Sequence, residues 1–510
     1  MARKPKPKNT LSAGQRAAMY EEQRRIAAER EATESTKSSD VEAAKPVGAE
    51  RAVAKPKPKP KPQGATVKVD LGVHGGKIGA LHGMCNGPVC DGGDISDIFV
   101  ELSVPCVRIG DVGGAIGGYV VDISSIFPDM NADERAPENY VFADTDKHIL
   151  AAAKTGAKII YRLGDSLIHG APEHKLALCG DYNKICTVCV NIIKHYNGGW
   201  GKGFALGIKD VEILSHVDIA SVTAKNKRED IFELYVRIAG ALKLYDDSLR
   251  VGGACFGSPS QTVREFLKYA KRANAPIDFL SVAIHSSTPE QMGAQIEKYL
   301  HILKNSGYAN SDIVVSQWGY LPEIDGVSVS DSLDISCERA EQKKQVFDTR
   351  ASVRGAAFIA SGLIKMLGYP QIRAACLYNG EASSLWCSVC DRFGIKQKPY
   401  YAISGYEKLV RAGDSLLCIS EQSPQHSHTG IYAASAGNQR EAYVMISAFD
   451  GVQSIDLRLD NIPDGFFTAD IYMLDGVKNL ELCSSVQLSG MRKRLVLNTS
   501  PYGVILIKLY

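Results

Sequence analysis

The segment Asp210–Asp218, with the sequence DVEILSHVD, contains a short apolar run that ends abruptly at polar residues. Val211–Leu214 has the length and the apolar character of a buried strand, and Ser215 and His216 follow it directly. A strand of this kind, with helical patterns before and after it, is typical of parallel β/α units. We therefore interpret the segment as one strand of a larger repeating arrangement.

Seven further apolar runs have the same character and alternate with helical patterns. They are Ile78–Met84, Val104–Ile109, Ala157–Leu163, Leu249–Gly253, Asp278–Ile284, Asp312–Ser316 and Ala374–Tyr378. The helices expected between the runs include Ile231–Tyr245, Thr262–Ala273, Pro289–Ser306 and Arg339–Met366. Eight such units predict an α/β fold, a (β/α)8 TIM barrel, in which site residues lie at the carboxyl ends of the strands.

Changes in composition divide the chain into three predicted parts. Residues 1–64 are basic, contain one aromatic residue and end in the Lys-Pro alternation Lys55–Pro62, which predicts a disordered tail and linker. Residues 65–412 hold the predicted barrel. Residues 413–510 contain short strands separated by turns, which predict a C-terminal β-sandwich domain. A tether to a protein partner is the alternative interpretation of the tail.

The composition also limits the class of protein. Of the 510 residues 45% are hydrophobic, which is enough for a large folded core, and the formal net charge is only +2. Because the basic excess lies in the tail, no nucleic-acid-binding surface is expected. No apolar segment predicts a secretory signal or a membrane span, and a cytoplasmic location is the default expectation.

Thirteen cysteines are present, and in a chain without a predicted signal we expect them to be reduced. Two C-x-x-C pairs, Cys186/Cys189 and Cys387/Cys390, have the spacing of zinc ligands but lie far apart in the sequence. Packing as small hydrophobic groups is the favoured interpretation, and zinc binding is the alternative. No cofactor and no metal is expected.

The segment GGWGKGFALGIKDVEILSHVD resembles a stretch of glycoside hydrolase family 39 that ends in W-E-I-W-N-E-P-D. The resemblance extends to LHGMCNGP (81–88), VRIGD (107–111), DIVVSQWGY (312–320) and KPYYAISGYEKL (398–409). The family contains β-xylosidases and α-L-iduronidases, so the resemblance implies a glycosidase-like barrel with a carbohydrate ligand. In this family strands before the barrel also enter the sandwich, which makes Ala65–Leu71 a candidate for it.

Both catalytic positions of the family are substituted in this chain. Matched residue by residue, His216 stands at the position of the acid/base Glu, Gln317 stands at that of the nucleophile Glu, and Ser215 replaces an Asn. Retaining hydrolysis needs two carboxyl groups roughly 5–5.5 Å apart, and an amide cannot form the glycosyl ester. The resemblance therefore implies a catalytically degenerate pseudoglycosidase that binds carbohydrate or a protein partner.

Two alternatives keep an enzymatic activity. In the first, the protein hydrolyses glycosidic bonds with reassigned groups, His216 serving as the acid and Asp165, Asp218 or Glu381 as the carboxylate. In the second, the enzyme depends on a metal held by imidazoles such as those of His82, His216 and His285.

Further residues at the predicted carboxyl ends of the strands are candidates for ligand binding. They are His82 and Asn86 at the end of the first strand, Arg108 and Asp111 at the end of the second, Asp165 after the third, and Tyr378 and Trp386 at the eighth. For Arg108 the alternative is a structural pair with Glu212. On the sixth strand, Val282 and Ala283 replace the Trp and His that line the family's sugar site, so an altered sugar-contacting surface is expected.

Overall fold

The computed structural model describes residues 64–510 apart from 91–92, 114–118, 167–179, 219–224, 324–339, 383, 385, 422–429 and 452–453. Residues 1–63, which make up nearly all of the predicted tail, lie outside the described residues. No helix of the described part is long and apolar enough to cross a membrane.

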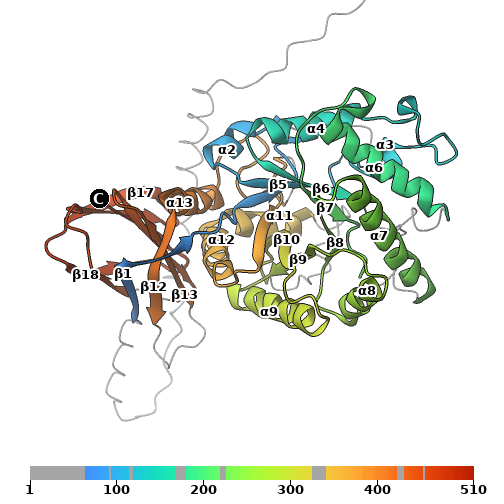
Figure 1. Ribbon diagram of the computed structural model, residues 1–510. Coiled ribbons are helices and arrows are strands. Elements are labelled where there is room, and N and C mark those ends of the chain that lie inside the picture. Colours follow the sequence, from blue (N-terminus) through green and yellow to red (C-terminus); the bar gives the residue numbers. More distant parts are fainter. Residues whose placement is uncertain are drawn as a thin grey trace, which may run out of the picture.

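Eight parallel strands form a closed barrel, as predicted (Figure 1). Each strand pairs with the next one along the chain, and the last strand closes the barrel on the first. The strands are β2 (Gly83–Cys85), β5 (Cys106–Ile109), β6 (Lys158–Leu163), β7 (Asp210–Ile213), β8 (Arg250–Phe256), β9 (Phe279–Ser286), β10 (Asp312–Tyr320) and β11 (Ile372–Tyr378). The first strand is much shorter than expected from Ile78–Met84, because the backbone N–H of Ile78 donates to the carbonyl of Gly413 and not to a barrel neighbour.

Helices surround the barrel in the order that the sequence predicts (Figure 1). The α-helices are α2 (Ser96–Glu101), α3 (Ile123–Ile126), α4 (Ala143–Lys154), α6 (Tyr182–Gly198), α7 (Lys225–Tyr245), α8 (Gln261–Arg272), α9 (Pro289–Asn305), α11 (Ala340–Ala351), α12 (Val353–Met366) and α13 (Lys398–Ala412). The single helix expected over Arg339–Met366 is in fact two. Ser352 has an extended backbone and its side chain accepts a hydrogen bond from the N–H of Arg354, so it caps the start of α12.

Side chains alternate between the interior of the barrel and the helix layer, as the pleat of a strand requires. The interior holds mostly small or medium side chains, which pack as a separate cluster: Cys85, Cys106, Ile160, Phe279, Val314, Ala374 and Cys376. Their alternating neighbours, such as Met84 and Val107, pack against the surrounding helices. The interior is therefore filled below the mouth. Polar side chains gather at the carboxyl ends of the strands, and a second charged group, Asp210 with Arg250 and Arg373, lies at the amino ends.

Two short strands, β3 (Val89–Cys90) and β4 (Gly93–Asp94), pair with each other, and the other strands form one nine-stranded sheet in the order β17-β16-β19-β14-β13-β12-β1-β15-β18. They are β1 (Gly64–Lys77), β12 (Asp414–Glu421), β13 (Gly430–Gly437), β14 (Ala442–Phe449), β15 (Ser454–Asp460), β16 (Thr468–Leu474), β17 (Asn479–Gln487), β18 (Arg492–Asn498) and β19 (Val504–Leu509). Apolar residues from both halves of the sheet share one core, so the sheet folds over itself in the manner of a sandwich. The expected strand Ala65–Leu71 lies within β1, which pairs with β12 and β15.

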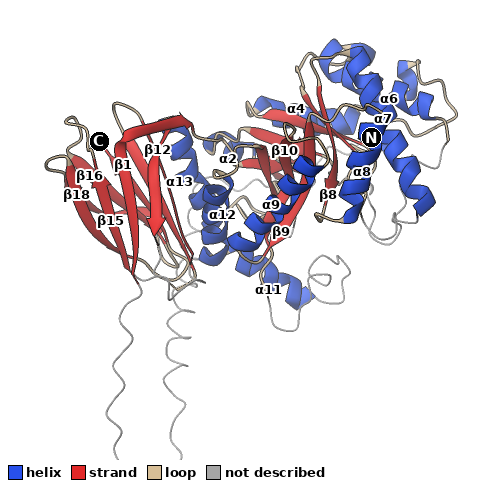
Figure 2. Ribbon diagram, turned by 60° about the horizontal axis from the view of Figure 1, so that its bottom comes forward, coloured by secondary structure: helices blue, strands red, loops and turns tan. Residues whose placement is uncertain are grey.

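Strand β17 was not expected from the sequence. Its side chains are almost all exposed or half-buried, and its residues NLELCSSVQ lack the regular alternation that marks a half-buried strand. The strand is formed through its antiparallel pairing with β16 at the edge of the sheet. Figure 2 shows α12 and α13 between this sheet and the barrel.

Candidate functional site

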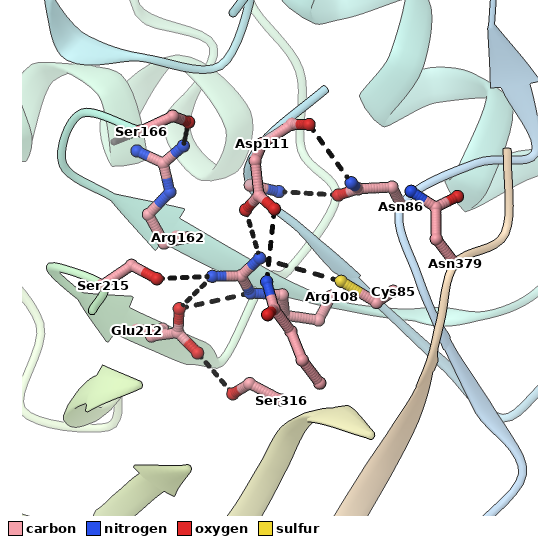
Figure 3. A network of polar contacts seen from close by, with 12 residues as sticks. Cys85, Asn86, Arg108, Asp111, Arg162, Ser166, Glu212, Ser215, Ser316 and Asn379 are labelled. Carbon is pink, nitrogen blue, oxygen red and sulfur yellow. Dashed lines mark hydrogen bonds and ion pairs between the residues drawn. The ribbon is translucent and has the colours of Figure 1, made fainter. Parts of the chain in front are cut away.

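The centre of the candidate site is Arg108 on β5, whose side chain is fully buried (Figure 3). Its Nη2 lies 2.5 Å from Oε1 of Glu212, and its Nη1 lies 2.7 Å from Oδ1 of Asp111. The same guanidinium donates to the Oγ of Ser215 at 3.4 Å. The structural pair of Arg108 with Glu212 is thus confirmed, and one cation is shared by two carboxylates.

Glu212 on β7 is fully buried and has partners for both of its oxygens. Oε1 accepts from Arg108, while Oε2 accepts from the hydroxyl of Ser281 at 2.6 Å and from that of Ser316. The two hydroxyls lie 2.5 Å apart. Sequence reasoning missed both serines, although a polar residue inside an otherwise apolar strand was a usable signal. Because its partners enclose it, Glu212 is held as a structural anion of the barrel.

A bulge on β10 directs Gln317 into the site. Against β9, Val315 pairs with Val282 and Gln317 pairs with Ala283, so Ser316 is an extra residue. The extra residue puts the side chains of both Ser316 and Gln317 on the interior side, where Ser316 contacts Glu212. The Nε2 of Gln317 donates to Oδ2 of Asp111 at 3.2 Å. Gln317 therefore belongs to the same polar network as Arg108.

The pKa of Asp111 is strongly lowered. Burial favours its neutral form, but Arg108 and Arg162 outweigh burial and lower the pKa of Asp111 to about 2. The side chain is a carboxylate at neutral pH and accepts hydrogen bonds from Arg108 and Gln317.

His216 follows β7 with a positive φ of 54°, a conformation that side chains seldom adopt. Its backbone N–H donates to the carbonyl of Cys255 at 3.2 Å. Burial lowers the pKa of His216, and the nearby Asp111 only partly opposes that effect. The imidazole is therefore neutral at neutral pH.

Asn86, after β2, joins the network from the other side (Figure 3). Its Oδ1 accepts from the N–H of Gly110 at 3.1 Å, and its Nδ2 donates to the backbone carbonyl of Asp111 and to Oε2 of Glu381. Glu381 also accepts from the Nδ2 of Asn379 at 2.8 Å. Sequence reasoning missed Asn379, although it directly follows the last barrel strand, which was the available signal.

Asp165, after β6, is a loop anchor. Its Oδ1 accepts the backbone N–H of Ser124, 3.0 Å away, at the start of α3. Burial and the neighbouring Asp122 raise the pKa of Asp165. Arg162 forms its ion pair with Asp122 and not with Asp165. Its Oδ2 is buried without a hydrogen-bond partner among the described residues, so the ligand-binding role of Asp165 stays a prediction.

His82 lies away from the network. It precedes β2 and is buried in the helix layer, where its ring packs edge-on against Tyr406 of α13 at 5.6 Å. The expected position at the mouth is wrong, because Gly83 and Cys85 face the interior and the alternation of the strand directs residue 82 outward. Among the described residues, no group of three or more His, Cys, Asp or Glu side chains is placed to hold a metal ion.

Three rings form a partly exposed cluster near the ends of β9 and β11. The ring of His285 lies 5.8 Å from that of Tyr378 and 6.2 Å from that of Trp386, and the rings of Tyr378 and Trp386 are 6.1 Å apart.

Of the two substituted positions on the sixth strand, only Ala283 faces the interior, since Val282 packs in the helix layer. The guanidinium of Arg350, from α11, stacks on Trp386 at 4.4 Å. No sequence signal distinguished Arg350 from other helix residues.

The cysteines of the described residues are free thiols. Cys387 and Cys390 lie close together, with their sulfur atoms 3.8 Å apart, in the buried loop after β11. Cys186 and Cys189 lie on α6, far from that loop in the sequence.

Comparisons with known proteins identify the architecture. No protein-family model matches the sequence, and no curated protein matches it. Among solved structures, a glucosidase from Croceicoccus marinus aligns with a TM-score of 0.68 and 20% identity, over 87% of this chain and 98% of that chain. This chain shares the fold of that glucosidase.

Two further structures support this fold. A GH39 enzyme from Xanthomonas axonopodis pv. citri aligns with a TM-score of 0.62 and 12% identity, over 87% of this chain and 97% of that chain. A β-xylosidase from Caulobacter crescentus CB15 aligns with a TM-score of 0.60 and 14% identity, over 87% and 99%. Because one fold can carry different functions, the chemistry of the site depends on the side chains of the present chain.

Proposed function

We propose that this protein is a pseudoglycosidase, a carbohydrate-binding barrel that does not hydrolyse glycosides by double displacement. The observation that carries the proposal is the amide of Gln317 at the end of β10, which is bonded to Asp111. An amide cannot attack the anomeric carbon to form a glycosyl ester, and it brings no negative charge beside an oxocarbenium ion.

The second catalytic position supports the same proposal. A general acid must hold a transferable proton near the leaving oxygen at the working pH. Burial lowers the pKa of His216, so its imidazole carries no such proton at neutral pH. The neutral imidazole of His216 is better suited to form a hydrogen bond with a bound sugar than to protonate a leaving group.

Hydrolysis with reassigned groups is the second candidate function. Asp165 and Asp218 accept backbone N–H groups of Ser124 and of Gly257, and so act as loop anchors. Glu381 is the carboxyl group that best suits this function, because Asn86 links it to Asp111 within the network. Its participation is testable by the substitution Glu381→Gln.

A hydrolysis assay separates the two functions. We expect no release of nitrophenol from aryl β-xylosides, β-glucosides or α-iduronides above the level of a Gln317→Ala control. Turnover that disappears in Glu381→Gln would contradict the proposal, as would a covalent glycosyl adduct detected by mass spectrometry. A His216→Glu/Gln317→Glu variant restores both family carboxyl groups and shows whether the rest of the site still supports the reaction.

Trp386 is expected to act as a platform for a sugar ring. Arg350 covers one of its faces, and the residue is half-buried, so part of the indole stays accessible to a ligand. We expect Trp386→Ala to weaken the binding of xylobiose or cellobiose roughly tenfold in calorimetry, which corresponds to about 1.4 kcal/mol. Trp386→Phe, which keeps an aromatic face, is the matched control and should lose less. Equal affinities for all three proteins would exclude the platform.

A further inference from the structure

Arg350 is a buried cation without an anionic partner. Its side chain is almost completely buried, and none of the ion pairs among the described residues includes it. Nη2 donates to the carbonyls of Tyr378 at 2.8 Å and of Trp386 at 3.0 Å. Nε and Nη1 are buried without a hydrogen-bond partner in the described part of the chain. A buried guanidinium with unused donors is costly unless a further group satisfies it.

His285 has a second unused nitrogen at the same place. Its Nδ1 is buried and has no hydrogen-bond partner among the residues that the structure describes. Burial and the nearby Arg350 both lower the pKa of His285, to about 3. A negative group beside the two side chains would reverse the effect of Arg350 on the imidazole.

Gly319 on β10 lies between the guanidinium of Arg350 and the imidazole of His285. A Cβ built on Gly319 would lie 3.2 Å from Nη2 of Arg350 and 3.4 Å from Nδ1 of His285. Both side chains therefore flank one backbone position at which a side chain is missing. Glycine at this position leaves the guanidinium and the imidazole beside each other, because a side chain here would push them apart.

We propose that Arg350 and His285 bind an acidic substituent of the carbohydrate, a carboxylate or a sulfate ester. The inference rests on the proposed carbohydrate-binding function and adds the chemical class of the ligand. Arginine suits both oxyanions, because its planar guanidinium donates two parallel hydrogen bonds.

The test compares sugars that differ in one group: methyl β-glucoside, methyl β-glucuronide and methyl β-glucoside 6-sulfate. In calorimetry, the unmodified protein is expected to bind at least one acidic sugar roughly tenfold more tightly than the neutral sugar. Which of the two binds more tightly identifies the oxyanion. Arg350→Met should reduce the preference to less than twofold. Arg354→Met, which removes a neighbouring cation stacked on Tyr320 and Tyr502, is the matched control and should retain it.

Gly319→Ala keeps the charge of Arg350 but puts a methyl group between its guanidinium and the imidazole of His285. It therefore tests the proposal even if Arg350→Met fails to fold. It should also abolish the preference. Equal binding of neutral and acidic sugars by the unmodified protein would overturn the inference and leave the proposed function standing. Absence of binding by all three sugars would overturn both. Sodium sulfate that binds as tightly as the acidic sugars would assign the site to a free inorganic anion and overturn the carbohydrate assignment.

Discussion

Arg108→Met is expected to destabilise the fold by about 3–5 kcal/mol, because it leaves the fully buried Glu212 without its cation. The substitution also removes the ion pair of Asp111. Met fills much of the volume of the arginine side chain, so the expected loss is electrostatic and not the result of a cavity. Urea denaturation followed by circular dichroism measures the change in the free energy of unfolding.

Two further variants show whether the pairing causes this loss. Arg108→Met/Glu212→Leu removes both charges and leaves Ser281 and Ser316 bonded to each other, so it should recover part of the stability. Arg350→Met removes an equally buried guanidinium that has no carboxylate partner in the described part of the chain, and should cost less than Arg108→Met. Equal losses for the two arginine variants, or a double variant that is less stable than either single one, would contradict this explanation.

Acid is expected to destabilise the protein well above the pH at which its carboxylates become protonated. Burial lowers the pKa of His82 from 6.5 to about 4. Below pH 6.5 the unfolded chain therefore binds a proton at this residue that the folded chain does not, and stability falls as the pH falls toward 4. Between pH 6.5 and 4, His82 alone lowers the free energy of unfolding by about 3 kcal/mol.

His82→Phe should remove this contribution, since a phenyl ring can occupy the apolar site beside Tyr406 and does not titrate. We expect the free energy of unfolding of the variant to depend less steeply on pH between 6.5 and 4, in urea titrations at several pH values. His301→Gln, at an exposed position of α9, is the control and should retain the steep dependence. An unchanged slope in His82→Phe would show that the imidazole is not kept neutral by burial.

The barrel was predictable because each of its eight strands carries its own local signal. Apolar runs such as Val211–Leu214 and Asp312–Ser316 have the right length, and the helices between them have the right period. The missed strand β17 and the division of the helix at Ser352 have a different origin. Strand β17 forms through its pairing with β16. The helix is divided because one residue, Ser352, adopts the conformation of an N-cap.

The candidate site was only partly predictable. Arg108, Asp111, Asn86 and Gln317 meet in one network, because each lies in the carboxyl-terminal half of a barrel strand or follows one. His82 was assigned wrongly, since the sequence did not reveal that the first strand starts only at Gly83. Arg350 could not be recognised, because a helix residue reaches the mouth only through the packing of α11 against the barrel.

The amino-acid sequence alone determined the eight β/α units and the residue types at the two substituted positions, His216 and Gln317, because strand length, periodicity and side-chain chemistry are local properties. Only the tertiary structure decided which charges are paired. Arg108 has two carboxylates and Arg350 has none among the described residues, although both are buried. The difference arises because ion pairing depends on distances of a few ångströms between strands and helices that are far apart in the chain.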